Sequence, residues 1–547
     1  MQGKIELHGA KQMLVSDTGI RQIESNNYIP GDCVLMFANG TSELVLREAQ
    51  SVVGVTKAVV NNISELYIAS LGPTCKFSPK ININSVVGDR FLLWLEENGE
   101  IVVKQHYGPS AKDDAACLID HYMLEEQRRP PYWVMGGNLY SVKDVVNHED
   151  LDTFTIDPET SVDFDDAISV DVANNTIYVH IVDIADIHQN NTHLADRCFT
   201  LYLANEHTEH LLSTEDASDT LSLVQGKSRP VITVKAVLTS EGTVSTYEIY
   251  RSTIVVKRRW DYGQVAAALE DGSAPQAIVY LDNLSKQRSS NVNYHISLPS
   301  VRLDIDKLTG DVRHLVSENT NDSAHTLVAT AMILANLIVS KHLSDLGVKM
   351  PNRFHDSLRG LNPTADFVST GNKEVDSFIL VKKYARAFYS IDMKGHFGLG
   401  IKDYVHFTSP MRRYADVVVH NLLAGCQYLM LDEEVDWINR RATKVRAIQS
   451  LYTLWKVIRH LRTLPVGPHE IWLTGVSPAG VMWFMPSLSL NGFMHVSTLV
   501  PTQYWSFEDD RLVGKTTGAV LAVGTKLNAF CKKIDDVTST VSLYLQT

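Results

Sequence analysis

Hydrophobic and polar residues alternate over short runs in the first 110 residues, as in "GDCVLMFANG", "ELYIASLGP" and "GDRFLLWLEENGEIVVKQHYG". Glycine, asparagine and proline interrupt these runs. Alternation with a period of two predicts half-buried strands, and such breaks predict turns. The pattern therefore predicts small β-barrels over residues 1–110. Residues 151–260 and 465–547 show the same short-strand pattern.

Apolar residues spaced by three and four predict helices elsewhere in the chain. One helix is predicted over 107–129, with a linker at "RRPPYW" (128–133), a second and very apolar helix over 323–346, and further helices across 373–464. Within that last stretch, 439–462 has an apolar face and a basic face, which predicts a solvated helix surface or support for a nucleic-acid path. Its cations are Arg440, Arg441, Lys444, Arg446, Lys456, Arg459 and Arg462.

The composition is that of an ordinary globular protein. The chain is 44% hydrophobic and 21% charged. Its 547 residues are enough for three or four domains. No apolar run reaches the length of a membrane span, and the N-terminus lacks the features of a signal or transit peptide. The six cysteines form no C-x-x-C pair, so we expect reduced thiols in a cytoplasmic or nuclear protein. The net charge of −13 argues against a nucleic-acid partner unless basic residues are concentrated locally.

Four aspartates gather in "TFTIDPETSVDFDDAISVD" (153–171), at positions 157, 163, 165 and 166. "AISVDV" and "TIYVHIVDI" alternate like paired strands around Asn174-Asn175, so the cluster is expected on a loop or strand edge that a sheet holds. Two charges about 4 Å apart repel by roughly 4 kcal/mol at an effective dielectric constant near 20. An all-oxygen group of this kind suits Mg²⁺ or Mn²⁺, and an exposed acidic turn explains the same residues equally well.

A second polar stretch, "GHFGLGIKDYVHFTSPMRRYADVVVHNLL" (395–423), contains the adjacent arginines Arg412 and Arg413. A planar guanidinium binds phosphate and stabilises charge that develops at phosphorus. Four carboxylates together with such an arginine are the groups that metal-assisted phosphodiester hydrolysis uses.

These two stretches resemble the hallmark blocks of the ribonuclease II/R (RNB) family. "TIDPETSVDFDDAIS" is similar to the D-x5-D-x-D-D signature of that family, and "GHFGLGIKDYVHFTSPMRRYADVVVH" is similar to its second block, about 240 residues later. Between them, "MILAN" (332–336) and "RFH" (353–355) also resemble family segments. The resemblance covers nearly the whole chain and identifies it as a compact, diverged member.

The resemblance implies a multidomain α+β fold with OB β-barrels at both ends. Its parts are an abbreviated cold-shock-type OB domain (1–50), a second cold-shock-type OB domain (51–110), a helical linker (111–150), an α+β RNB catalytic domain (151–464) and an S1-type OB RNA-binding domain (465–547). In the last domain, the aromatic residues of "MWFM" (482–485) and "GFMH" (492–495) are either stacking platforms for bases or part of the barrel core.

The resemblance further implies a 3′→5′ exoribonuclease that degrades single-stranded RNA processively to nucleoside 5′-monophosphates. The implied cofactor is a pair of Mg²⁺ ions, which Mn²⁺ can replace, and the implied form is a monomer without a membrane partner. The implied metal ligands are Asp157, Asp163, Asp165 and Asp166. Asp165 and Arg412 are the implied catalytic residues, and the implied RNA contacts are Tyr202, which would stack on the terminal base, Arg413 and His355.

The chain departs from the family pattern at two places. Ala329 and Thr330 stand where family members often have two glutamates, and "YLAN" replaces the Y-L-P that usually follows the stacking tyrosine. A competing hypothesis is a catalytically inactive RNA-binding relative, because some relatives keep the architecture and lose the aspartates. A structural calcium-binding protein is a third hypothesis, which leaves the arginine block unexplained. Activity that depends on Mg²⁺ and is lost in a carboxylate variant separates the first hypothesis from the other two.

Overall fold

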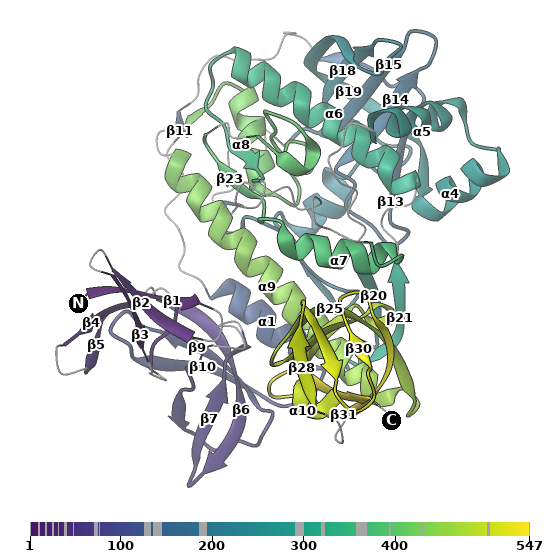
Figure 1. Ribbon diagram of the computed structural model, residues 1–547. Helices are drawn as coiled ribbons and strands as arrows, with labels where there is room; N and C mark the ends of the chain where they lie inside the picture. Colours follow the sequence, from purple (N-terminus) through teal and green to yellow (C-terminus); the bar gives the residue numbers. More distant parts are fainter. Residues whose placement is uncertain are drawn as a thin grey trace.

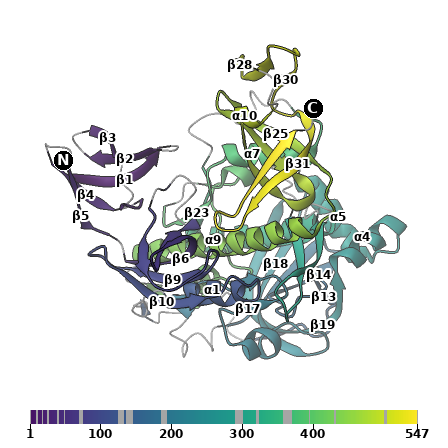
Figure 2. The same cartoon turned by 90° about the horizontal axis from the view of Figure 1, so that it is seen from below.

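The computed structural model describes residues 2–8, 11–16, 19–23, 27–30, 32–37, 41–47, 49–69, 75, 77–124, 133–134, 145–184, 194–289, 300–318, 323–356, 369–392, 395–428, 431–499 and 504–545. Figure 1 shows N-terminal strands in purple, a central α/β part in teal and green, and C-terminal strands in yellow. The long helix α9 (Leu431–Thr463) runs between these three parts in this view and in Figure 2.

Two antiparallel five-stranded sheets make up the N-terminal part, and each has a small apolar core of its own. The first has the order β3-β2-β1-β4-β5, with β1 (Gln2–His8), β2 (Lys11–Ser16), β3 (Gly19–Ile23), β4 (Cys33–Met36) and β5 (Ser42–Leu46). The second has the order β10-β9-β6-β7-β8, with β6 (Gln50–Val60), β7 (Ile63–Tyr67), β8 (Lys80–Asn82), β9 (Arg90–Leu95) and β10 (Ile101–Tyr107). The predicted β-rich character is confirmed, and the cold-shock type stays a prediction.

The helix predicted over 107–129 is shorter in the structure. Strand β10 extends to Tyr107, and α1 spans only Asp113–Met123. The reason is the Gly108-Pro109 segment between them, because the buried Arg90 guanidinium donates to the Gly108 carbonyl from Nε (3.1 Å) and Nη2 (2.7 Å). The linker predicted at 128–133 lies outside the described residues, except for Trp133 in the short strand β11 (Trp133–Val134), which pairs with β24 (Gln427–Tyr428).

The central part is built on a six-stranded sheet of order β12-β19-β13-β14-β15-β18. Its strands are β12 (Val146–Asn147), β13 (Thr153–Asp157), β14 (Asp166–Asp171), β15 (Thr176–Val182), β18 (Ser228–Leu238) and β19 (Val244–Asp261). The first part of the long β19 pairs antiparallel with β18, and its last residues pair parallel with β13, so β19 closes the sheet on itself. The predicted hairpin around Asn174-Asn175 is the antiparallel pair β14–β15 and is confirmed.

Helices cover this sheet and share one large apolar core with it. They are α3 (Leu194–Arg197), α4 (Tyr262–Asp271), α5 (Gln276–Ser289), α6 (Ser323–Asp345) and α8 (Tyr414–Leu423). Around them lie a π-helical turn (Asp216–Thr220), a 3₁₀ turn (Phe397–Leu399), helix α7 (Lys373–Lys383) and the two-stranded pairs β16 (Leu201–Leu203) with β17 (His207–Glu209), β20 (Ser300–Ile305) with β21 (Val312–Glu318), and β22 (Asn352–Phe354) with β23 (Phe388–Ser390).

Helix α6 confirms the apolar helix predicted over 323–346. Among the described residues it alone is long and apolar enough to cross a membrane by length and composition. More than half of its most apolar window, 56%, is buried inside the fold. The expectation of no membrane span therefore depends on the packing of α6 against the central sheet, because its length and composition do not exclude one.

The C-terminal part is a five-stranded antiparallel sheet, β27-β26-β25-β31-β32, with a small three-stranded sheet beside it. Its elements are β25 (Pro468–Ser477), β26 (Gly480–Met485), a 3₁₀ turn (Pro486–Leu488), β27 (Leu490–His495), α10 (Val496–Leu499), β28 (Trp505–Glu508), β29 (Arg511–Gly514), β30 (Val520–Leu521), β31 (Lys526–Asp535) and β32 (Thr540–Leu545). Trp483 and Phe484 are fully buried and belong to apolar cores, so a stacking role is wrong for them, whereas Phe493 is 46% exposed. The S1 type stays a prediction.

The basic stretch 439–462 covers all of α9 except its first eight residues and its last one. The expectation of a solvated face is wrong for two of its cations. Arg441 and Lys456 are both buried. Arg441 lies over the Tyr122 ring of α1, with its guanidinium carbon 4.4 Å from the ring centre. Lys456 donates to the backbone carbonyls of Ala111 (2.9 Å) and Gly310 (2.6 Å). These cations therefore hold α1 and the β20–β21 hairpin against α9.

The burial of α6 predicts a large effect of truncating Leu334, which is 1% exposed in the central core. Leu334→Ala is expected to lower the free energy of unfolding of the central part by about 2–5 kcal/mol, because it removes apolar contacts and leaves a cavity. Urea denaturation followed by circular dichroism measures the change. Leu346→Ala, at a side chain 51% exposed, is the matched control and should change it by less than about 0.5 kcal/mol. Equal effects of the two variants would contradict this packing.

Candidate active site

The aspartate loop runs from Asp157, the last residue of β13, to Asp166, the first residue of β14. Arg259 of β19 holds this loop. The parallel pairing of β19 with β13 places Arg259 beside Thr155, close to the start of the loop. Its Nη2 donates to the carbonyls of Pro158 (3.2 Å), Glu159 (2.7 Å) and Ser161 (3.3 Å). A loop without its own secondary structure thereby gains fixed backbone partners.

Ser222 fixes the second half of the same loop. Its buried hydroxyl accepts from the Phe164 amide (3.0 Å) and donates to the Val162 carbonyl (3.0 Å). The Phe164 carbonyl accepts from the Leu223 amide (3.1 Å). These bonds set the direction in which the neighbouring side chains of Asp163 and Asp165 leave the chain.

The second hallmark block meets this loop at Asp165, which is 3% exposed. The Met411 amide donates to Asp165 Oδ1 (2.8 Å), and Arg412 Nε lies 3.3 Å from Asp165 Oδ2. The Arg412 side chain also donates from Nη2 to Ser409 Oγ (3.2 Å) and keeps 46% of its surface exposed. Arg412 is therefore a fixed but accessible cation beside a buried carboxylate.

The turn that carries Arg412 (residues 409–413, the arginine turn) is anchored by α8. Asp416 of α8 is fully buried, and its Oδ1 accepts from the Ser409 amide (2.8 Å) and from Arg413 Nη2 (2.8 Å). The buried Asn336 of α6 adds a second anchor, because its Oδ1 accepts from the Phe407 amide (2.8 Å). The "MILAN" segment thus has a structural role in placing the second block.

Tyr202 of β16 completes the cluster, since its hydroxyl donates to Asp163 Oδ2 (2.6 Å). The segment before β16 is tied to the arginine turn: the Thr200 amide donates to the Arg412 carbonyl (3.1 Å), and Phe199 forms a bridge with Arg413. The structure therefore brings together the aspartate loop, the arginine turn and the predicted stacking tyrosine.

Burial dominates the electrostatics of the aspartates. It raises the pKa of Asp165 to about 7, while the nearby Arg412 charge and the Met411 amide oppose that rise. Burial also raises the pKa values of Asp157 and Asp166, and the charge of Asp157 adds to the rise at Asp166. The ionised forms of these carboxylates therefore need compensation by positive charge.

The four aspartates divide into two pairs. Asp163 and Asp165 accept hydrogen bonds from protein groups, as described above. Asp157 and Asp166 repel each other, and Asp157 Oδ2 is buried without a hydrogen-bond partner in the described part of the chain. No three His, Cys, Asp or Glu side chains among the described residues form a group that could hold a metal ion by themselves. Asp157 and Asp166 nevertheless fit a hard cation, because they present only oxygen ligands and one of these has no other partner.

The two other predicted RNA contacts have structural partners. Arg413 pairs with the buried Asp416 and begins α8 as its N-cap residue. His355 Nδ1 accepts from the Gly398 amide (3.0 Å), so its Nε2 carries the proton and donates to the Ala385 carbonyl (3.0 Å). Burial lowers the pKa of His355, which agrees with this neutral form. Their contacts with RNA stay predictions.

Sequence reasoning missed Arg259 and Ser222, which both hold the aspartate loop. "VVKRRWD" contains Arg259, but its role depends on the parallel pairing of β19 with β13, which no local pattern predicts. Ser222 lies 56 positions after Asp166 without any motif around it.

The comparison with protein families identifies the class. The RNB domain model matches residues 146–427, just over half of the 547-residue chain. The chain therefore belongs to the RNB domain family, as its sequence blocks predict.

Curated relatives extend the similarity. Ribonuclease R of Chlamydia pneumoniae is 30% identical over 446 residues, which are 70% of this chain and 65% of that protein. Ribonuclease R of Thermotoga maritima is 27% identical over 503 residues, 79% of this chain and 70% of that protein. The chain thus spans about two thirds of the length of these relatives.

Solved structures share the fold. The RNase R of Mycoplasma genitalium in complex with ribose-methylated single-stranded RNA has a TM-score of 0.79 at 19% identity and covers all of both chains. Yeast Ssd1, described as a pseudonuclease, has a TM-score of 0.67 at 16% identity and covers 94% of this chain and 81% of that one. The multidomain RNase R-like fold is confirmed by this likeness.

The raised pKa of Asp166 predicts a stability effect that depends on pH. A carboxyl whose pKa is higher in the folded state binds its proton more tightly there, so stability falls as pH rises from about 4 to about 7. Without divalent metal, Asp166→Asn should therefore raise the free energy of unfolding at pH 8 by about 2–4 kcal/mol and leave it unchanged near pH 4.

Urea denaturation in a chelating buffer at both pH values measures this effect. Asp152→Asn, at an exposed side chain five residues before Asp157, is the control and should change nothing at either pH. A variant that is destabilised equally at pH 4 and pH 8 would contradict the raised pKa of Asp166 in the folded protein.

Proposed function

We propose that this chain is a metal-dependent 3′→5′ exoribonuclease that degrades single-stranded RNA processively to nucleoside 5′-monophosphates. The observation that carries the proposal is the contact of Asp165 with Met411 and Arg412. It joins the aspartate loop to the arginine turn, so both hallmark blocks of an RNB-family chain meet in one site. The names of the curated relatives, Ribonuclease R, support the same activity.

The cofactor in this proposal is Mg²⁺, with Mn²⁺ as a substitute and two ions as the expected number. Asp157 and Asp166 would hold it, with Asp163 and Asp165 contributing through their remaining lone pairs. A divalent ion at such a site activates water and neutralises charge on the phosphate oxygens.

The residues of the chain account for the other requirements of the reaction. Water attacks the terminal phosphorus, the bond from phosphorus to the 3′ oxygen of the preceding nucleotide breaks, and that oxygen takes up a proton. Arg412 uses Nε for Asp165 and Nη2 for Ser409, so guanidinium hydrogens remain for a phosphate oxygen whose negative charge grows. Asp165 keeps Arg412 in place and is itself kept in place by the Met411 amide.

Tyr202 places the RNA end in this proposal. Its hydroxyl is tied to Asp163, so its ring has a fixed position next to the aspartate loop. Stacking on an aromatic ring is tolerant of sequence and is worth about 1–3 kcal/mol per base. A monomer acting on single-stranded RNA in the cytoplasm is the simplest setting, and the 2′-hydroxyl is the group that would distinguish RNA from DNA.

The direct experiment uses a 5′-labelled single-stranded RNA of about 30 nucleotides with Mg²⁺, resolved on a denaturing gel. The wild type is expected to shorten it from the 3′ end to a very short stub, and Asp165→Asn should leave it intact. RNA that is bound but uncut by both proteins would overturn the proposal in favour of an inactive RNA-binding relative.

Arg412 provides a second prediction. Arg412→Lys is expected to lower kcat by about 10²–10³-fold with little change in RNA affinity, because lysine cannot contact Asp165, Ser409 and phosphate with one planar group. Single-turnover kinetics and fluorescence anisotropy measure the two quantities. Arg288→Lys on α5 is the matched control and should keep wild-type kinetics. An unchanged rate in Arg412→Lys would remove Arg412 from the mechanism.

A further inference from the structure

The turn that follows Tyr202 is held by contacts from two other parts of the chain. The β16–β17 turn reads "LANE" over 203–206, and its Ala204 has a φ of 49°, in the left-handed region that a residue with a Cβ rarely adopts. A non-glycine residue persists there only when its surroundings fix it. The contacts of this turn are therefore expected to matter for the strand that carries Tyr202.

Three side chains on one face of α9 hold this hairpin. Gln449, Tyr452 and Lys456 are spaced by three and four, so they lie in a row along the helix. Gln449 Nε2 donates to the Tyr202 carbonyl (3.3 Å). The Tyr452 hydroxyl donates to Glu206 Oε2 (2.5 Å), and Lys456 Nζ lies 2.9 Å from the same oxygen.

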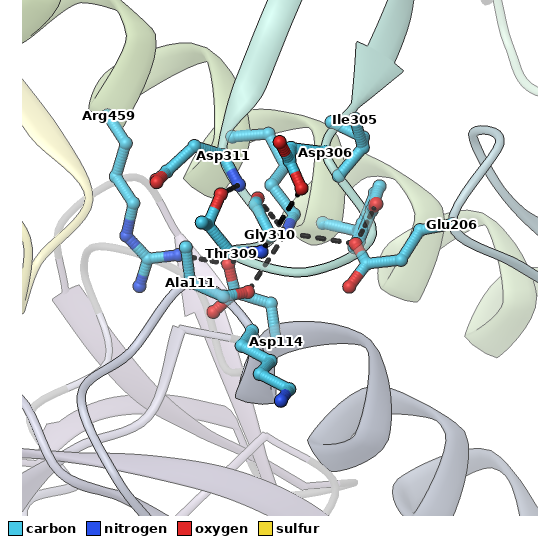
Figure 3. Close-up of polar contacts among 12 residues, drawn as sticks. Ala111, Asp114, Glu206, Ile305, Asp306, Thr309, Gly310, Asp311 and Arg459 are labelled. Atoms are coloured by element: carbon cyan, nitrogen blue, oxygen red, sulfur yellow. Dashed lines mark hydrogen bonds and ion pairs between the residues drawn. The ribbon is translucent and has the colours of Figure 1, made fainter.

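Lys456 belongs to a buried junction between several parts of the chain. Its side chain is 1% exposed, and it contacts Glu206, Asp114 of α1 (3.6 Å) and the carbonyls of Ala111 (2.9 Å) and Gly310 (2.6 Å). Figure 3 shows Ala111, Asp114, Glu206 and Gly310 gathered at this point. Asp114 is fully buried and also pairs with Arg90 and Arg459.

A second contact fixes the turn from the β20–β21 hairpin. Asn205 Oδ1 accepts from the Ile305 amide (2.8 Å), and Asn205 Nδ2 donates to Asp304 Oδ1 (2.7 Å). The Asn205 side chain therefore bonds this turn to β20. Burial and the Glu206 charge raise the pKa of Tyr452, so its hydroxyl stays a donor.

We propose that Glu206, held by Tyr452 and Lys456, is a positioning residue that sets the place of Tyr202 on Asp163. The inference rests on the proposed function and deepens it, because residues outside the hallmark blocks then help to position the RNA end. We call the contacts of Glu206 with Tyr452 and Lys456 the Glu206 contacts. The Glu206 contacts link α9 and the N-terminal part to the site through the β16–β17 hairpin.

A double-mutant cycle tests whether Tyr452 acts through Tyr202. Tyr452→Phe removes only the hydroxyl on Glu206, and Tyr202→Phe removes only the hydroxyl on Asp163. Each is expected to lower kcat/KM for a short RNA by about three- to tenfold, chiefly through KM. Because both act on one contact, the double variant should be no more than about twofold worse than Tyr202→Phe alone.

The proposal would be overturned if the losses in kcat/KM of the two single variants multiply in the double variant. Wild-type kinetics for Tyr452→Phe would overturn it as well. Tyr280→Phe on α5 is the matched control, and thermal unfolding of all variants separates positioning from a loss of fold. Glu206→Gln should act like Tyr452→Phe.

If the wild type does not cleave RNA, the proposed function fails. The same cycle is then measured as the Kd for a 3′-fluorescent RNA. Non-additive effects on Kd support the positioning role of Glu206, and independent effects overturn it.

Discussion

The buried contact of Asp165 with the Met411 amide and with Arg412 is the interaction on which the site depends. It joins two segments that lie 246 positions apart in the sequence. A carboxylate that is only 3% exposed requires such partners, because an ionised group without compensation is costly in a protein interior. The same contact leaves the Arg412 side chain half exposed, as a group that must meet a phosphate would be.

Every layer around this contact serves to bring the two segments together. The closed sheet places the ends of β13 and β14 side by side, and Arg259 and Ser222 fix the loop between them. From the other side, α6 and α8 hold the arginine turn through Asn336 and Asp416. Helix α9 runs between the three parts of the chain, and its buried Lys456 ties the segment before α1 and the β20–β21 turn together. The precision of the site thus comes from side-chain bonds to backbone groups of otherwise irregular segments.

The sequence predicted the features that depend on local pattern. The place of the aspartates on a loop at the edge of a sheet, the hairpin at Asn174-Asn175 and the apolar helix α6 all follow from local periodicity. The meeting of the two blocks followed only from the resemblance to a family, because no local rule connects Asp165 with Arg412. The role of Arg259 depends on a parallel strand pairing, and the burial of Lys456 depends on three distant segments, so neither could be seen in the sequence. A basic helix face looks the same in sequence whether water, RNA or backbone carbonyls receive its charges.

In the proposed function, Asp165 and Arg412 form one hydrolytic site for the 3′ end of RNA. The most direct measurement follows the fate of a label on the 3′-terminal nucleotide in a single turnover with Mg²⁺. We expect the wild type to release the label first, as a nucleoside 5′-monophosphate, and Asp165→Asn to bind the RNA and retain the label. Release of the label as an oligonucleotide, or equal release by both proteins, would contradict it.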